Sequence, residues 1–245
     1  MRTVRLAFAH TRIQILELLR IPGFSVATLS FPTLLFVLFG LPRAHGDADL
    51  LLASYAAFGV LGVGFFQFGV STAIERSTPW YVYVRTLPAP ALARIAARVL
   101  SALAFATVAS GLVIGVALAT TSASLDAGAW LRLVATLLLG AVPFVVLGLS
   151  IAYWTTPRSA LPIANVLYML LSYAGGLWTG PADLPHAVQA ISRFTPTRQW
   201  GDVLWPAVLG TSWQASHWLA LAAYACAFAL VAGWGYHRDE GQRFT

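Results

Sequence analysis

Six stretches without a charged residue divide this chain into apolar segments. Each is long enough for a membrane-crossing helix, which needs about 20 mostly apolar residues. The pattern predicts spans at 24–41, 50–74, 99–120, 133–156, 159–180 and 216–236. Only Thr156, Pro157 and Arg158 separate the fourth span from the fifth, and proline favours a tight turn because it cannot continue a helical hydrogen-bond ladder. We therefore expect an all-α integral membrane protein with one transmembrane domain over residues 1–245.

The composition agrees with this fold class and excludes others. Hydrophobic residues make up 58% of the 245 residues and charged residues 10%, with a mean hydropathy of +0.74. Soluble domains usually carry about a quarter charged residues, so a soluble enzyme and a disordered protein are both excluded. All 15 basic residues are arginine. Without lysine the chain has no Walker A lysine and no Schiff-base lysine, so ATP could drive this protein only from another chain.

The arginines predict the orientation in the membrane. With the N-terminus inside, the inner segments hold eleven arginines and the outer segments hold four. Because basic residues concentrate on the cytoplasmic side, this bias places both termini in the cytoplasm. The net charge of +6 is then explained by topology, and we expect no nucleic-acid partner.

Residues 1–22 precede the first span and form an amphipathic pattern. One face of the predicted helix is mostly apolar, with Val4, Phe8, Thr11, Ile15, Leu18 and Leu19, and the other carries Arg2, Arg5, Arg12 and Arg20. Glu17 lies three residues before Arg20, a favourable helical pair. This segment is interpreted as an interfacial helix whose arginines meet lipid headgroups, and it could also contact a cytoplasmic partner.

The longest inner loop, 75–98, predicts a short helix of its own. Thr78 and Pro79 form a typical helix start, and proline again at 88 and 90 ends a helix over 80–87. Held between two spans, this helix could act as a mechanical handle. The alternative is an interfacial turn with Trp80, Tyr81 and Tyr83 as aromatic anchors.

The outer segment 181–215 is broken by proline and predicts two short helices, near 186–194 and 200–209. They are too short to cross a bilayer. The segment either dips into the membrane and returns as re-entrant helices, where surrounding protein buries its backbone, or forms an ordinary surface loop.

The predicted spans carry no carboxylate, and their one histidine, His217, lies at the end of a span, so none of them offers a proton or sodium site in the middle of the membrane. Gln67 and Asn165 are their main amides, and each either binds substrate or links helices. One cysteine, Cys226, and five scattered histidines predict no metal site. No Ser/His/Asp set or HExxH motif supports catalysis, so a membrane-embedded enzyme is disfavoured, as is an ion-coupled carrier or channel.

Three stretches in order resemble the permeases of ABC type-2 transporters, membrane subunits of exporters driven by a separate ATPase. The first runs from Glu17 to Pro22 and then Phe31-Pro32. The second is Ile74-Glu75-Arg76 followed by 85–88, RTLP. The third runs over 177–181, LWTGP, then 184–185, and 194–197, FTPT. The resemblance covers essentially the whole chain. One departure is Ser77-Thr78-Pro79, where the family often has a further acid and a glycine.

The resemblance implies a mechanism and a set of site residues. Two permease subunits, identical or sibling chains, would form the path, and two ABC ATPase subunits would dock below them and carry the ATP and Mg²⁺. This chain would hold no cofactor, no metal and no catalytic residue. The expected ATPase-coupling residues are Glu75, Arg76, Trp80, Tyr81, Arg85, Glu17 and Arg20. The expected path residues are Gln67, Phe65, Phe68, Asn165, Tyr168 and Tyr173, and the expected outer gate is Trp178, Pro185, Phe194 and Trp200.

From this resemblance we expect a multi-pass permease of a bacterial cytoplasmic (inner) membrane, in contact with membrane lipid. Its substrate would be an amphipathic small molecule, such as a drug or antibiotic, moved out of the cell. A lipid-linked saccharide exporter would use the same plan and stands as the alternative.

Overall fold

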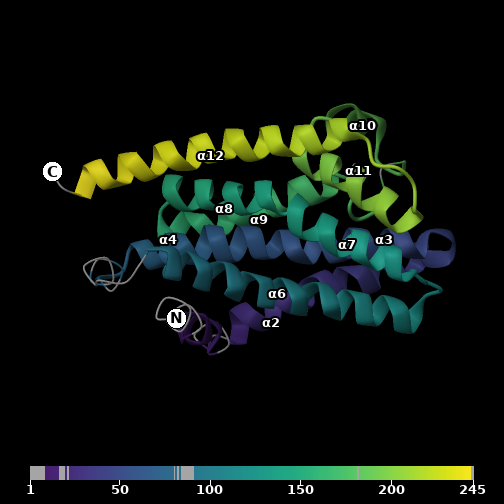
Figure 1. The fold of residues 1–245 in the computed structure, drawn as a ribbon, viewed down its shortest axis with the longest axis horizontal. Coiled ribbons are helices and arrows are strands. Elements are labelled where there is room, and N and C mark those ends of the chain that lie inside the picture. Colours follow the sequence, from purple (N-terminus) through teal and green to yellow (C-terminus); the bar gives the residue numbers. More distant parts are fainter. Residues whose placement is uncertain are drawn as a thin grey trace.

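The protein is a bundle of helices aligned along one long axis (Figure 1). The computed structural model describes residues 9–16, 20, 22–79, 81, 83, 91–180 and 182–243, and no strand occurs among them. Its helices, in chain order, are α2 (Pro22–Leu35), π-helical η1 (Phe36–Gly40), 3-10 η2 (Leu41–Arg43), α3 (Ala44–Val63), π-helical η3 (Gly64–Val70), α4 (Ser71–Arg76), α6 (Ala91–Thr120), α7 (Ala127–Gly140), α8 (Val142–Trp154), α9 (Pro157–Ala174), α10 (His186–Ser192), α11 (Pro196–Leu209) and α12 (Ala215–Arg243).

Four helices among the described residues are long and apolar enough to cross a membrane: Gly46–Arg76, Ala96–Thr120, Ala127–Trp154 and Ala215–Asp239. A shorter apolar helix covers Thr28–Arg43. The all-α membrane fold is thus confirmed, whereas the count of six crossings stays a prediction. The predicted fifth span, 159–180, is an 18-residue helix that ends at Ala174, because the chain then turns through Gly176, whose φ of 76° suits glycine.

The helical segment α3–η3–α4 occupies the centre of the bundle and packs against α2, α6, α8, α9 and α11. Of the 18-residue apolar stretch in this segment that could cross the membrane, 83% is buried, whereas the share is 17% for the corresponding stretch of α12 at the edge. Close packing with α8 depends on glycine, because a Cβ on Gly148 would overlap the backbone carbonyl of Gly64 in η3. The second predicted span is therefore the core of the fold.

Side chains at the helix ends explain where several helices begin. Asp126 accepts the backbone N–H of Ala129 at 2.6 Å at the start of α7. Thr156 and Ser159 form a reciprocal capping box on α9. Thr195 accepts the N–H of Arg198 at 3.2 Å, so α11 begins at Pro196, earlier than the predicted start near Trp200.

The segment 182–215 is folded against the bundle, at the end opposite to α4 (Figure 1). α11 packs on α3, α7 and α12, and one of its faces is buried. The fully buried Trp200 donates its indole N–H to the carbonyl of Thr136 in α7 at 2.9 Å. This contact anchors α11 to the bundle.

Candidate functional site

Arg76, the last residue of α4, lies where three helices end. Its side chain is only 7% exposed. The guanidinium donates to the carbonyl of Ala152 in α8 and pairs with Asp239 near the end of α12. The Cζ atom of the guanidinium also lies 4.6 Å from the centre of the Tyr153 ring. One arginine therefore joins the ends of α4, α8 and α12.

The preceding residue, Glu75, makes the corresponding link on the other side of α4. Its carboxylate pairs with Arg98 of α6, and Arg98 also donates to the hydroxyl of Thr72. Glu75 is 41% exposed and Arg98 21%, so solvent screens this pair more than the Arg76 contacts. Two consecutive residues thus connect α4 to α6 on one side and to α8 and α12 on the other.

We call this set, Glu75, Arg76, Arg98, Ala152 and Asp239, the α4-end cluster. Its charges are paired at the end of the apolar helices, where burying an unpaired charge would cost several kcal/mol. The cluster therefore ties the ends of four helices together.

The chain that follows the cluster begins a helix as expected. Thr78 accepts the backbone N–H of Tyr81 at its side-chain oxygen, at 3.3 Å, as an N-cap does. Tyr81 is half-buried. The expected coupling residues Trp80 and Arg85 lie outside the described residues.

The N-terminal amphipathic segment contacts the same end of the bundle. Residues 9–16 are helical, and the hydroxyl of Thr11 donates to the carbonyl of Ala97 in α6 at 3.4 Å. Ile15 packs with Phe68 and its neighbours, whereas Arg12 is exposed, in keeping with the predicted faces. Arg20 is exposed, and Glu17 lies outside the described residues.

The six expected path residues do not surround one cavity. Phe65 and Tyr168 are fully buried in the core, with ring centres 6.2 Å apart. Tyr168 stacks on Phe58 at 4.4 Å and donates to its carbonyl at 3.0 Å. Tyr173 lies farther along, 6.0 Å from Trp178. These aromatic rings hold α9 against α3.

The two amides have different environments. Gln67, in η3, is buried and donates to the hydroxyl of Ser101 in α6 at 2.7 Å. Phe68 borders an apolar groove beside α6. Asn165 is exposed on the outer face of α9, between Leu161 and Leu170, which are also exposed. Gln67 therefore links η3 to α6, whereas the side chain of Asn165 can contact groups outside this subunit.

The four expected gate residues are also dispersed. Trp178 is half-buried against Phe58, at 5.8 Å between ring centres. Pro185 caps α10 and is exposed, and Phe194 is 65% exposed. Trp200 lies in the core. Only the first three reach the surface of the protein.

Sequence reasoning missed Arg98 and Asp239 as members of the α4-end cluster. Arg98 was visible as an arginine at the start of the third span. Asp239 follows the sixth span, and no local pattern indicates its pairing with Arg76. Among the described residues, no group of three or more His, Cys, Asp or Glu is placed to hold a metal ion.

Comparisons with known proteins give a consistent result. The profile of the ABC-2 type transporter family matches residues 5–209. The chain is 28% identical over 189 residues to a Bacillus subtilis protein described as "Putative transport permease YvfS", with 77% of each chain covered. No solved structure gives a significant match.

Proposed function

Since the chain belongs to the ABC-2 type transporter family, we propose that it is the permease subunit of an ATP-driven exporter. ATP and Mg²⁺ bind on a separate ABC ATPase subunit, since this chain has no lysine for a phosphate-binding loop. The exporter carries an amphipathic small molecule out across a bacterial cytoplasmic membrane. The arginine bias, eleven inner against four outer, supports placing both termini in the cytoplasm.

The α4-end cluster is the observation that carries this proposal. It directly precedes the loop 77–90 and joins α4, α6, α8 and α12 through Glu75 and Arg76. An ATPase that pushes on this loop moves four helix ends as one body. In this scheme Glu75 and Arg76 transmit the motion, while Tyr81 and the neighbouring Trp80 and Arg85 contact the ATPase. The N-terminal helix adds a second contact through Glu17 and Arg20.

The exposed amide of Asn165 supports a path shared by two permease subunits. A polar side chain facing lipid is costly, so such groups usually face protein or a water-filled cavity. We place this face of α9 toward a second permease subunit, where Asn165 contributes to the path. Trp178, Pro185 and Phe194 then lie near its outer opening.

The proposal is tested first by reading the adjacent reading frame, which is expected to encode a chain with a GxxxxGK[ST] motif, and then by co-expressing the two chains. The purified permease alone is expected to hydrolyse no ATP, and the complex is expected to be stable and active. Inside-out vesicles holding the complex should accumulate a fluorescent amphiphile with ATP. A complex whose ATPase lacks its Walker A lysine serves as the control.

A charge reversal separates coupling from transport. Arg85→Glu is expected to leave ATP hydrolysis but abolish accumulation, whereas Arg158→Glu, exposed at the start of α9, should leave both unchanged. ATP hydrolysis by the permease alone, or ATP-independent uptake driven by a proton gradient, would refute the assignment. Transport of a lipid-linked saccharide in place of the amphiphile would favour the alternative substrate class.

A further inference from the structure

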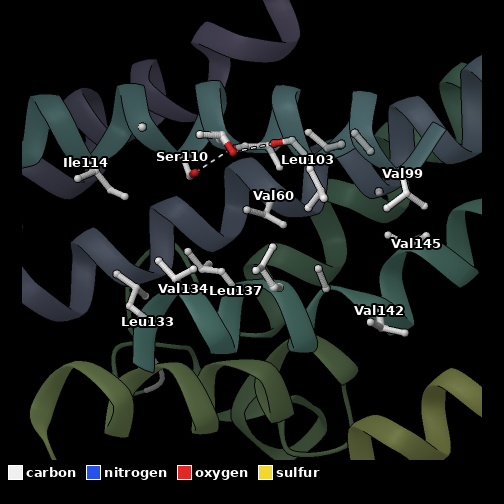
Figure 2. A pocket seen from close by; sticks show the side chains of 18 of the residues that line it. Val60, Val99, Leu103, Ser110, Ile114, Leu133, Val134, Leu137, Val142 and Val145 are labelled. Atoms are coloured by element: carbon white, nitrogen blue, oxygen red, sulfur yellow. Dashed lines mark hydrogen bonds between the residues drawn. The ribbon is translucent and has the colours of Figure 1, made fainter. Parts of the chain in front are cut away.

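An apolar groove of about 490 Å³ runs between α6 and the α7–α8 pair, with α3 and η3 behind it (Figure 2). Its floor is buried and includes Val63 and Leu133. Its rims are exposed: Leu103 is 39% exposed on α6 and Val134 48% on α7. The groove is therefore open along the side of the bundle.

The lining is almost entirely apolar. Thr107 and Ser110 are the hydroxyl-bearing residues of the lining, and each donates to the carbonyl four residues earlier in α6, at 2.8 and 2.7 Å. Figure 2 shows the Ser110 hydroxyl turned back to its own helix. The remaining side chains are aliphatic or aromatic, apart from glycine, and among them only Trp130 carries a polar group, its indole N–H. A lining so poor in polar groups is complementary to hydrocarbon.

The groove lies at the depth of the bilayer. On α6 it extends from Val99 to Ile114, within the apolar helix Ala96–Thr120. At 1.5 Å per residue, the groove is about 22 Å long. One leaflet contributes about 15 Å to the hydrocarbon core, so the groove is longer than one leaflet is thick. We propose that this groove binds an acyl chain of a membrane lipid, which fills the space between α6 and α7.

The dimensions favour a single chain over a transmembrane helix of a partner. The volume of 490 Å³, spread over about 22 Å, gives a mean cross-section of about 22 Å². A helix about 10 Å across needs roughly 80 Å². Gly111 borders the groove, and a Cβ there would meet no atom within 4 Å, so this position opens into the space that the acyl chain occupies.

Gly115 provides a matched control. It lies one turn further along α6, a Cβ there would also meet no atom within 4 Å, and it does not line the groove. Phenylalanine at Gly111 should fill the groove, whereas phenylalanine at Gly115 should project from the surface of the same helix. A helix docking across both glycines would be blocked by either change.

The experiment uses phosphatidylglycerol with a photoactivatable diazirine in one acyl chain. The full-length chain is reconstituted into phosphatidylethanolamine–phosphatidylglycerol vesicles that contain this lipid. It is then solubilised in detergent, washed with unlabelled lipid and photolysed. Mass spectrometry compares labelling of 99–114 and 133–145 with labelling of α12, whose Leu219 and Leu230 are exposed without a groove.

The wild type and Gly115→Phe are expected to retain label on the groove segments in excess of α12. In Gly111→Phe this excess should be lost. Equal labelling of groove and α12 in the wild type, or an unchanged excess in Gly111→Phe, would overturn the proposal. Loss of the excess in Gly115→Phe as well would show that the labelling does not depend on the groove and would also overturn the proposal.

A second pair of variants covers the case that Gly111→Phe does not fold. Val134→Trp is on the groove rim, and Leu131→Trp, 73% exposed on the same helix, is outside the groove. Only Val134→Trp should remove the excess labelling. These outcomes do not depend on ATP hydrolysis or transport, so the lipid site and the exporter assignment can fail separately.

Discussion

Replacing Arg76 by alanine is expected to destabilise the protein more than any exposed arginine would. Arg76 is 7% exposed, and its guanidinium contacts α8 and α12 at once. A hydrogen bond from a charged donor contributes about 1.5–3 kcal/mol. The contact with the Tyr153 ring, at 4.6 Å, adds roughly 0.5–1 kcal/mol.

The ion pair with Asp239 adds less than the hydrogen bond to α8, because the Asp239 side chain is 23% exposed and solvent screens its charge. We therefore expect Arg76→Ala to lower the free energy of unfolding by about 3 kcal/mol. The stability of Arg76→Lys should lie between those of the wild type and Arg76→Ala, since lysine keeps the charge but cannot spread its donors over two acceptors.

The measurement is equilibrium unfolding of the purified chain in mixed micelles with increasing denaturing detergent, followed by tryptophan fluorescence. Arg158→Ala is the control, because it removes the same charge from an exposed position and should change stability by less than about 0.5 kcal/mol. A double-mutant cycle with Asp239→Asn isolates the ion pair, with an expected coupling of about 0.5–1 kcal/mol.

Two results would refute the reasoning. If Arg76→Ala behaved like Arg158→Ala, the arginine would not hold the helix ends together. If the cycle gave no coupling, the pair with Asp239 would add nothing to stability, and α12 would be held by its contacts with α8, such as the bond from Ser150 to the carbonyl of Phe228.

Three further changes have defined outcomes in the same unfolding assay. Gly148→Ala should cost about 1–3 kcal/mol, because its Cβ would meet rigid η3 backbone, whereas Gly233→Ala, with open space around it, should be neutral; equal effects would contradict the close approach of α8 and η3. Trp200→Phe should cost about 1 kcal/mol or more, since the α7 carbonyl loses its buried donor, and a neutral result would remove that anchor. Ser101→Ala should cost only about 0.6 kcal/mol, the average for such bonds within membranes; a loss of transport far beyond this would show that the bonded glutamine, Gln67, binds substrate.

The positions of the apolar helices could be predicted from sequence because solvation by hydrocarbon depends on a local run of residues. The uncharged window 50–74 lies within one helical run, which follows a kink at Asp47 and ends at Arg76. The end of α9 at Ala174 was not predictable in this way. It depends on a turn at Gly176, inside a run that is still apolar.

The candidate site was only partly predictable, because its partners come from distant parts of the chain. The resemblance to ABC type-2 permeases indicated Glu75 and Arg76, which follow the second span. Their partners Arg98 and Asp239 follow from how the helices pack. Aromatic type was a poor guide for Trp200, since a tryptophan is equally compatible with an opening and with a core position where its N–H finds a carbonyl.

The central position of α3–η3–α4 has a consequence for the biogenesis of the protein. This helix is synthesised before all the helices that bury it except α2. The indole of Trp205 reaches the hydroxyl of Ser54 across 151 residues, which a ribosome adding 5–20 residues per second needs about 8–30 s to make. During that interval the surface that will become the core faces lipid or the insertion machinery. The segment α3–η3–α4 must therefore be held in the membrane by other proteins or by its own hydrophobicity until α11 has been synthesised.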